Sequence, residues 1–332
     1  MPFHNYGSAW LLLATAMIAA NFELNWSTKA PLPRAQAGGA AAHFGNMILV
    51  AGGTAWESGV KLWLNDVQVY DTGADRWRAG PALPEPLAYG PFAQSESALE
   101  IFGGTGGATV SRKIWRIDSS LDRWMPAGDT PADLLLSRAA RIGRRVFLFG
   151  GCADVADLTR CTDAVWMRQD RDPWRQVAKL PAGRVALSAA AVLNGRVFLF
   201  GGCSMPAAGK LINRAEAWSF DADAFSFKRL RDLPVRNRGL SAVAAAGRVW
   251  LAGGYTASQE EAAGQGPEFG FTAAVWSYDP AANQYQSHAP MPVAMTSIEL
   301  FPHAASLWGA GGEDRMRGRS ARTLAAAITG AK

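Results

Sequence analysis

Cysteine and histidine are scarce in this chain of 332 residues, which has 3 Cys and 4 His. The cysteines, Cys152, Cys161 and Cys203, show no CxxC spacing, so we expect neither a zinc site nor a thioredoxin-like redox site. No glycine-rich phosphate loop leads into a helix, because Gly103–Gly107 is better explained as a Gly-Gly pair followed by a flexible loop. We therefore predict no metal ion and no cofactor.

The chain also lacks the usual features of membrane-spanning and nucleic-acid-binding proteins. Its apolar runs are interrupted by Gly, Arg or Asp long before they reach the roughly 20 residues that cross a bilayer. The formal net charge is +5, but the basic residues are scattered and form no Lys/Arg cluster. We expect no membrane span in the mature protein and no nucleic-acid partner.

The apolar stretch at residues 9–20 (AWLLLATAMIAA) is followed at once by polar residues. This pattern predicts a cleaved signal peptide over residues 1–20, a mature domain over 21–332, and a periplasmic or secreted protein. In such an oxidising compartment Cys152 and Cys161, which we place in one loop, could form a disulfide and leave Cys203 free. A bridge between Cys161 and Cys203 is the alternative.

Glycine, in contrast, is abundant, with 35 residues, and it marks an internal repeat. An apolar strand that ends in Gly-Gly recurs about every fifty residues. Most copies continue with an aromatic residue before an acid, as in VQVYD at 67–71, then a second aromatic such as Trp77, and then a step such as Leu83-Pro84. The six pairs are Gly52-Gly53, Gly103-Gly104, Gly150-Gly151, Gly201-Gly202, Gly253-Gly254 and Gly311-Gly312.

These motifs resemble the kelch repeat over nearly all of residues 21–332. The resemblance implies an all-β fold, a six-bladed kelch β-propeller whose blades are four-stranded antiparallel sheets. The sixth unit ends after its third strand, whereas residues 22–33 supply Trp26 and a Leu-Pro step without a preceding Gly-Gly. We expect the N-terminal strand to complete the C-terminal blade and close the ring, which leaves no open sheet edge.

In such blades, the loop after the second strand and the loop that leads into the first strand emerge on the same face. That face should carry the loop at 311–319 (GGEDRMRGR) and the arginines after Leu-Pro steps, namely Arg34, Arg184, Arg236 and Arg238. Guanidinium groups offer paired donors to a carboxylate. Alternatively, these arginines face solvent and pair with local acids. His43 and His303 should lie in turns on the opposite face, which argues against a copper oxidase and against a Ser/His/Asp hydrolase.

A second resemblance concerns the Gly-Glu that is followed six residues later by Arg, at Glu313 and Arg319. It is similar to the N-acetylneuraminate epimerase group, which are sialic acid mutarotases of the kelch type. The resemblance implies that Glu313 is the proton acceptor and that Arg319 orients it or holds the substrate. The pair lies here on the last blade rather than on a middle one. With Arg34 from the adjoining blade, we expect the two residues to converge on one cleft.

Two functions follow as hypotheses. The first is an exported, cofactor-free isomerase that interconverts anomers of an acidic sugar such as N-acetylneuraminate, with Arg34, Arg184, Arg236 and Arg238 binding the substrate. The second is a non-catalytic kelch module that binds a glycan or a protein on its loop face, because propellers host many functions. The sequence leaves open whether the protein is an enzyme. The position of Glu313, in a pocket or on an exposed loop, distinguishes the two.

Overall fold

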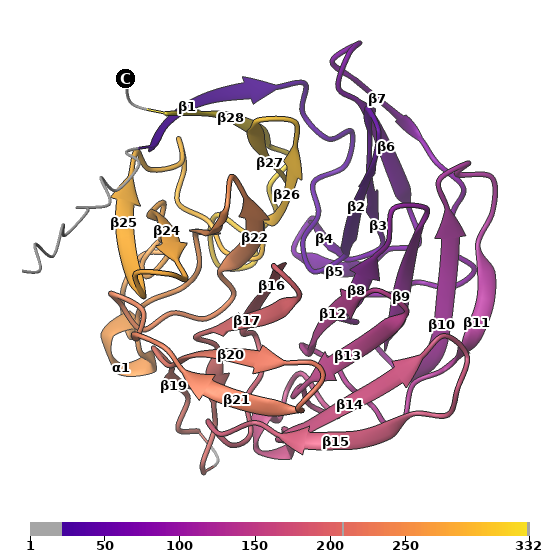
Figure 1. The fold of residues 1–332 in the computed structure, drawn as a ribbon. Helices are drawn as coiled ribbons and strands as arrows, with labels where there is room; N and C mark the ends of the chain where they lie inside the picture. The colour runs from indigo at the N-terminus through magenta and orange to yellow at the C-terminus, as the bar shows by residue number, and fades with distance from the viewer. Residues whose placement is uncertain (1–21, 208, 331–332) are drawn as a thin grey trace, which may run out of the picture.

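The structure, a computed structural model, describes residues 22–207 and 209–330. Figure 1 shows six four-stranded antiparallel sheets arranged as blades around a central axis, which confirms the predicted propeller. The expected signal peptide, residues 1–20, lies outside the described residues. Within the described part, no helix is long and apolar enough to span a membrane.

Each blade runs from an inner strand beside the axis to an outer strand at the rim. The first three blades are β2 (Ala40–Phe44), β3 (Met47–Ala51), β6 (Val67–Asp71) and β7 (Arg76–Ala79); β8 (Phe92–Gln94), β9 (Ala98–Thr105), β10 (Val110–Asp118) and β11 (Met125–Asp129); and β12 (Arg138–Ile142), β13 (Arg145–Phe149), β14 (Ala164–Gln169) and β15 (Arg175–Lys179). The next two are β16 (Ala189–Leu193), β17 (Arg196–Phe200), β20 (Ala217–Asp221) and β21 (Ser226–Arg229); and β22 (Ser241–Ala245), β23 (Arg248–Ala252), β24 (Val275–Asp279) and β25 (Gln284–His288).

The sixth blade combines both ends of the chain. Its strands are β26 (Glu299–His303), β27 (Ser306–Ala310), β28 (Thr323–Gly330) and β1 (Phe22–Lys29). The N-terminal strand β1 pairs with β28 in antiparallel register from Phe22 opposite Gly330 to Lys29 opposite Thr323. The predicted closure is thus confirmed, and Figure 1 shows the indigo and yellow ends of the chain side by side.

Short elements occupy the loops that follow the second strands of the blades. These are the hairpins β4 (Thr54–Glu57) with β5 (Val60–Trp63) and β18 (Cys203–Ser204) with β19 (Ile212–Asn213), the 3₁₀ turn η1 (Leu158–Arg160) and the helix α1 (Gln259–Ala262). Because these loops emerge at one end of the axis, they build a single loop face.

The composition of the strands follows their distance from the axis. The inner strands are rich in alanine, as in AAAHF of β2 and AAAVL of β16, because six of them crowd together there. Large aromatic side chains fill the wider space between blades farther out. Between blades six and one, for example, Tyr70 packs against Trp77 and Trp308 with ring centroids 5.0 and 5.8 Å away.

Aromatic side chains at the outer strands also fasten most blades to the preceding one. The Nε1 group of Trp77 donates a hydrogen bond to the Ala30 carbonyl of blade six at 2.8 Å, and Trp124 donates to Pro81 of blade one at 2.9 Å. Equivalent bonds to the preceding blade are made by Trp174, Tyr285 and Trp26. The second aromatic of the repeat thus has a structural role, which Phe227 of blade four cannot share because it has no donor.

The Gly-Gly pairs bring each second strand against the backbone of the next blade. The Gly202 amide donates to the Asn237 carbonyl of the following blade at 2.8 Å. The same carbonyl oxygen would stand 2.5 Å from a Cβ on Gly201, whose φ is +58°. Gly311 faces the Gln36 carbonyl of blade one in the same way, at 2.6 Å. Only glycine fits these positions.

A belt of backbone hydrogen bonds surrounds the axis where the chain enters the inner strands. At this level each blade contributes one residue with a positive φ. From the second blade to the sixth, the amide of this residue donates a hydrogen bond of 2.7–3.0 Å to the carbonyl of its equivalent in the preceding blade, so five bonds link all six blades. We call these six residues the belt: Gly38, Tyr89, Leu136, Leu187, Gly239 and Ser297.

Replacing Gly201 by alanine should destabilise the fold because the new Cβ would meet a backbone atom that cannot move without shifting the next blade. We expect the free energy of unfolding to fall by about 3 kcal/mol or more in chemical denaturation. The control is Gly195→Ala in the turn between β16 and β17, where φ is +72° but nothing lies within 4 Å. It should cost only about 1 kcal/mol. Equal losses in the two variants would contradict the role of the Gly-Gly contact.

Candidate functional site

A pocket of about 320 Å³ opens on the loop face at the mouth of the axis. Its floor is formed by the belt residues Tyr89, Leu136, Leu187, Gly239 and Ser297. Its walls come from the loops that follow Gly-Gly pairs and from residues beside the belt: Lys61, Val155, Arg238, Tyr255, Phe271, Thr296, Glu313 and Met316. The two kinds of loop that we expected on one face therefore meet here.

Six equivalent backbone bridges stand around this mouth, one in each blade. Each joins the residue after Gly-Gly to the residue before the belt: Ala37–Thr54, Ala88–Thr105, Leu135–Cys152, Ala186–Cys203, Arg238–Tyr255 and Thr296–Glu313. Four blades place only small, apolar or thiol side chains at these positions. Blades five and six differ, because their bridges carry a guanidinium and a carboxylate, one in each of the two adjacent blades.

Glu313 forms an ion pair with Arg319, whose Nη1 lies 2.9 Å from Oε1. Arg319 is only 6% exposed, and its Nε donates to Thr54 Oγ1 at 3.0 Å, so the guanidinium connects blade six to blade one. Burial raises the pKa of Glu313, while the charge and hydrogen bond of Arg319 oppose that rise. The predicted pair is therefore present, and its carboxylate lines the pocket rather than an exposed loop.

Arg238 is held at the pocket wall by contacts that the sequence did not indicate. Its guanidinium lies over the Tyr255 ring, 4.3 Å from the centroid, and Nη1 donates to Asn213 Oδ1. Asn213 is itself fixed, because its Nδ2 donates to the carbonyls of Tyr255 and Ala257. Burial lowers the pKa of Arg238. The side chain thus presents a partly desolvated cation to the pocket.

Lys61 supplies a second cation, from the β4–β5 hairpin. Its Nζ lies 4.4 Å from the centroid of Trp63 and 5.0 Å from that of Tyr89. The pocket therefore combines two cations, one carboxylate and several aromatic rings. Such a surface can bind an anionic group that is attached to an apolar body.

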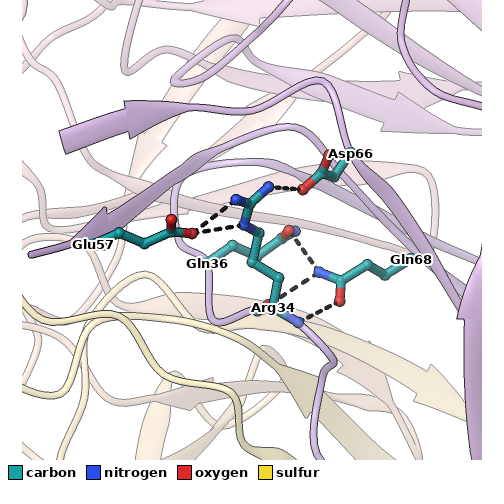
Figure 2. A network of polar contacts seen from close by, with 5 residues as sticks. All are labelled: Arg34, Gln36, Glu57, Asp66 and Gln68. Carbon is teal, nitrogen blue, oxygen red and sulfur yellow. Dashed lines mark hydrogen bonds and ion pairs between the residues drawn. The ribbon is translucent and has the colours of Figure 1, made fainter. Parts of the chain in front are cut away.

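The other arginines that we expected to bind a ligand lie outside this pocket. Figure 2 shows that the Arg34 guanidinium forms ion pairs with Glu57 at 2.8 Å and Asp66 at 2.5 Å, both in blade one. The Arg34 amide donates to Gln68 Oε1, and Gln68 Nε2 donates to the Arg34 carbonyl and to Gln36 Oε1. These contacts tie the entry of blade one to its third strand.

The expected convergence of Arg34 with Glu313 and Arg319 is thus wrong, because two nearby carboxylates hold the guanidinium. Arg184 and Arg236 are exposed on the rim and do not line the pocket. Arg184 Nη1 is 3.4 Å from the Thr159 carbonyl. Of the four arginines, only Arg238 reaches the pocket.

The three cysteines lie in one buried cluster beside the pocket. All three are thiols in this structure, and Cys152 and Cys161 face each other across an antiparallel bridge with their side chains in hydrogen-bond contact. Burial raises the pKa of the Cys203 thiol to about 12. The arrangement favours Cys152 over Cys203 as the neighbour of Cys161, and the disulfide stays a prediction.

An axial channel continues below the belt. Glu299 on β26 faces this channel from blade six, and Arg138 on β12 faces it from blade three. Burial raises the pKa of Glu299 to about 7, against the opposing charge of Arg138. His43 and His303 lie near the ends of the inner strands β2 and β26, at the opposite mouth as predicted, but within the strands rather than in the turns that we expected.

The raised pKa of Glu299 predicts a specific pH dependence of stability. Because the folded protein holds this proton more tightly than the unfolded chain, the stabilisation is complete below pH 4.5 and is lost as the pH rises to about 7. Unfolding free energies measured from pH 4 to 8 should fall for the wild type relative to Glu299→Gln by up to about 3 kcal/mol. A difference between the two proteins that does not change with pH would contradict this assignment.

Comparison with known proteins agrees with the repeat. The Kelch motif matches residues 37–84, which run from the first mouth bridge to the Leu83-Pro84 step. The chain carries a Kelch motif. Kelch-like protein 25 of Xenopus tropicalis is 25% identical over 280 residues, which cover 80% of this chain and 43% of that protein.

Two further Kelch-like proteins are similar to most of this chain at comparable identity. Kelch-like protein 25 of Homo sapiens is 26% identical over 249 residues (70% of this chain, 39% of the relative), and Kelch-like protein 38 of Rattus norvegicus is 22% identical over 292 residues (85% and 46%). The chain therefore spans less than half the length of these curated relatives. None of these matches indicates the N-acetylneuraminate epimerase group.

Proposed function

We propose that this chain is a non-catalytic kelch module that binds a protein on its loop face, around the axial pocket. The observation that carries the proposal is the distribution of exposed apolar side chains. Among the described residues, the exposed large hydrophobic side chains are Val60, Val235, Phe269 and Met316, with exposed fractions of 41–59%. Val60 lies at the tip of the β4–β5 hairpin and the other three lie in loops, all on this one face, and Met316 lines the pocket itself.

The chemistry of the pocket complements that apolar rim. Lys61 and Arg238 would receive an anionic group, while Tyr89, Tyr255 and Phe271 supply aromatic surface around it. Aromatic residues, methionine and arginine are enriched at the centre of protein-binding surfaces. The similarity to Kelch-like proteins supports a binding module more than an isomerase. A glycan is a second possible ligand of such a module, with less support than a protein.

The proposal includes export of the protein. It rests on the apolar stretch of residues 9–20, and the presence of three thiols in one buried cluster is compatible with a disulfide formed after export.

Met316→Asp should weaken partner binding at least tenfold, because it places a charge in the apolar rim without disturbing the core. Proteins retained by the immobilised wild type would be purified and titrated calorimetrically against each variant. The control is Asn46→Asp, which adds the same charge in the turn after β2, at the opposite mouth, and should leave the affinity unchanged. Equal affinities for wild type and Met316→Asp, or equal losses in both variants, would reject the loop face as the binding surface.

Anomer interconversion is kept as a second candidate because of one observation, the Glu313–Arg319 pair inside the pocket. Ring opening needs a proton taken from the anomeric hydroxyl and a proton given to the ring oxygen, and a carboxylate with a shuttled water can do both. For such an isomerase, the rate of exchange between the anomers of N-acetylneuraminate, measured by NMR, should exceed the background rate. It should fall roughly 100-fold in Glu313→Gln. Exchange at the background rate in the wild type would reject the isomerase hypothesis, and the binding module would be the one remaining proposal.

A further inference from the structure

The axial channel below the belt contains two opposed charged side chains that the mouth pocket does not use. Two connected voids, of about 60 and 100 Å³, share the lining residues Phe92, Arg138 and Glu299. The upper void also shares the belt residues Tyr89 and Leu136 with the mouth pocket, among others. The channel is therefore the inward continuation of the mouth, separated from it by the belt.

Neither charged group is satisfied by the protein. Arg138 Nε donates to the Ser188 carbonyl, and this is its one side-chain hydrogen bond within residues 22–207 and 209–330. In the same part of the chain, the Glu299 carboxyl has no hydrogen bond, and neither side chain forms an ion pair. Both residues are only partly buried, so the Glu299 carboxyl and the Nη groups of Arg138 are open to the channel and can contact a species bound there.

The other residues that line the lower void limit which ligand could bind there. The lower void is lined otherwise by small or apolar residues, namely Pro91, Phe92, Ala139, Ala189, Ala190, Ser241, Ala242 and Leu300. The Ser241 hydroxyl already accepts a bond from the Leu300 amide. A cation would be repelled by Arg138, whereas the two terminal nitrogens of a guanidinium match the two oxygens of a carboxylate.

We propose that the axial channel is a binding site for a small monocarboxylate, of the size of acetate or lactate, held between Arg138 and Glu299. The ligand carboxylate accepts hydrogen bonds from the Nη groups of Arg138. On the other side of the axis, the protonated carboxyl of Glu299 donates its proton to a ligand oxygen. A void of about 100 Å³ is several times the roughly 10–15 Å³ that one water needs on the same measure, so it has room for such an ion.

Binding should therefore be coupled to uptake of a proton by Glu299, since two carboxylates side by side repel each other. No other charged side chain faces Glu299 from β2, β16, β22 or β27 at this depth of the described structure. His43 and His303 lie at the far ends of β2 and β26, and Arg141 on β12 is ion-paired with Glu100. The raised pKa of Glu299 supplies the proton near neutral pH.

Acetate is the probe for this site, with acetamide and methylammonium as neutral and cationic counterparts. Calorimetric titration and saturation-transfer NMR at pH 6 should detect acetate binding to the wild type, at least tenfold weaker binding in Arg138→Gln, and no binding of methylammonium. Above pH 7 the wild-type affinity should fall about tenfold per pH unit. Glu299→Gln should bind acetate with little pH dependence, because its amide donates a hydrogen bond at every pH.

Arg236→Gln, the same change on the exposed rim, serves as the matched control and should bind acetate like the wild type. The inference does not depend on the apolar side chains of the loop face, so it stands or falls separately from the loop-face proposal. The inference is overturned if folded wild type does not bind acetate, if acetamide or methylammonium binds as well, or if affinity is unchanged in Arg138→Gln. Should Arg138→Gln fail to fold, the loss of pH dependence in Glu299→Gln decides the question.

Discussion

The belt of backbone hydrogen bonds around the axis is the constraint on which the other features depend. It joins residues of six blades that are about fifty positions apart in the chain, and it uses main-chain groups alone. The amides can point along the belt only where φ is positive, and four of the six residues, including Leu136 and Leu187, are not glycine. Each such residue costs about 1–2 kcal/mol of backbone strain. Packing against the surrounding blades must hold these residues in place, since an isolated chain would rarely adopt such conformations.

The belt also divides the axis into compartments with different surroundings. Above it, the side chains of Tyr89, Leu136 and Leu187 form the floor of the mouth pocket; below it, the alanine-rich inner strands leave a narrow channel. Because the main chain is fixed at this level in every blade, side chains can vary on either side of the belt without disturbing the fold. Polar groups at the axis, such as Arg238 and Glu299, are therefore tolerated where a core position would exclude them.

The blades differ in chemistry at the positions where the six-fold repeat is broken. The residues at the mouth bridges are small, apolar or thiol in four blades, and Arg238 and Glu313 are the charged exceptions. The pairing of Arg319 with Glu313 and Thr54 shows how the last blade uses the first to hold its carboxylate. Closure by β1 is thus more than a stabilising device, because it brings blade one next to the loop that carries the site.

The sequence by itself determined the elements that repeat. The period of the Gly-Gly pairs and of the aromatic strands specified six blades, and the Trp26 segment without a Gly-Gly specified closure. The resemblance at Glu313 and Arg319 pointed to a pair within one loop, where a short connection limits the partners. Local patterns of this kind depend on backbone conformation and nearest neighbours, which are encoded within one unit.

Only the tertiary structure decided which side chains meet, within a blade or between blades. Arg34 has Glu57 and Asp66 as partners, Lys61 reaches Tyr89 of the next blade, and Glu299 faces Arg138 across the axis. Such contacts depend on how far each loop folds over the mouth and on which rotamer its neighbours allow. The repeat pattern does not specify these side-chain partners, so their meeting follows from ring geometry and packing.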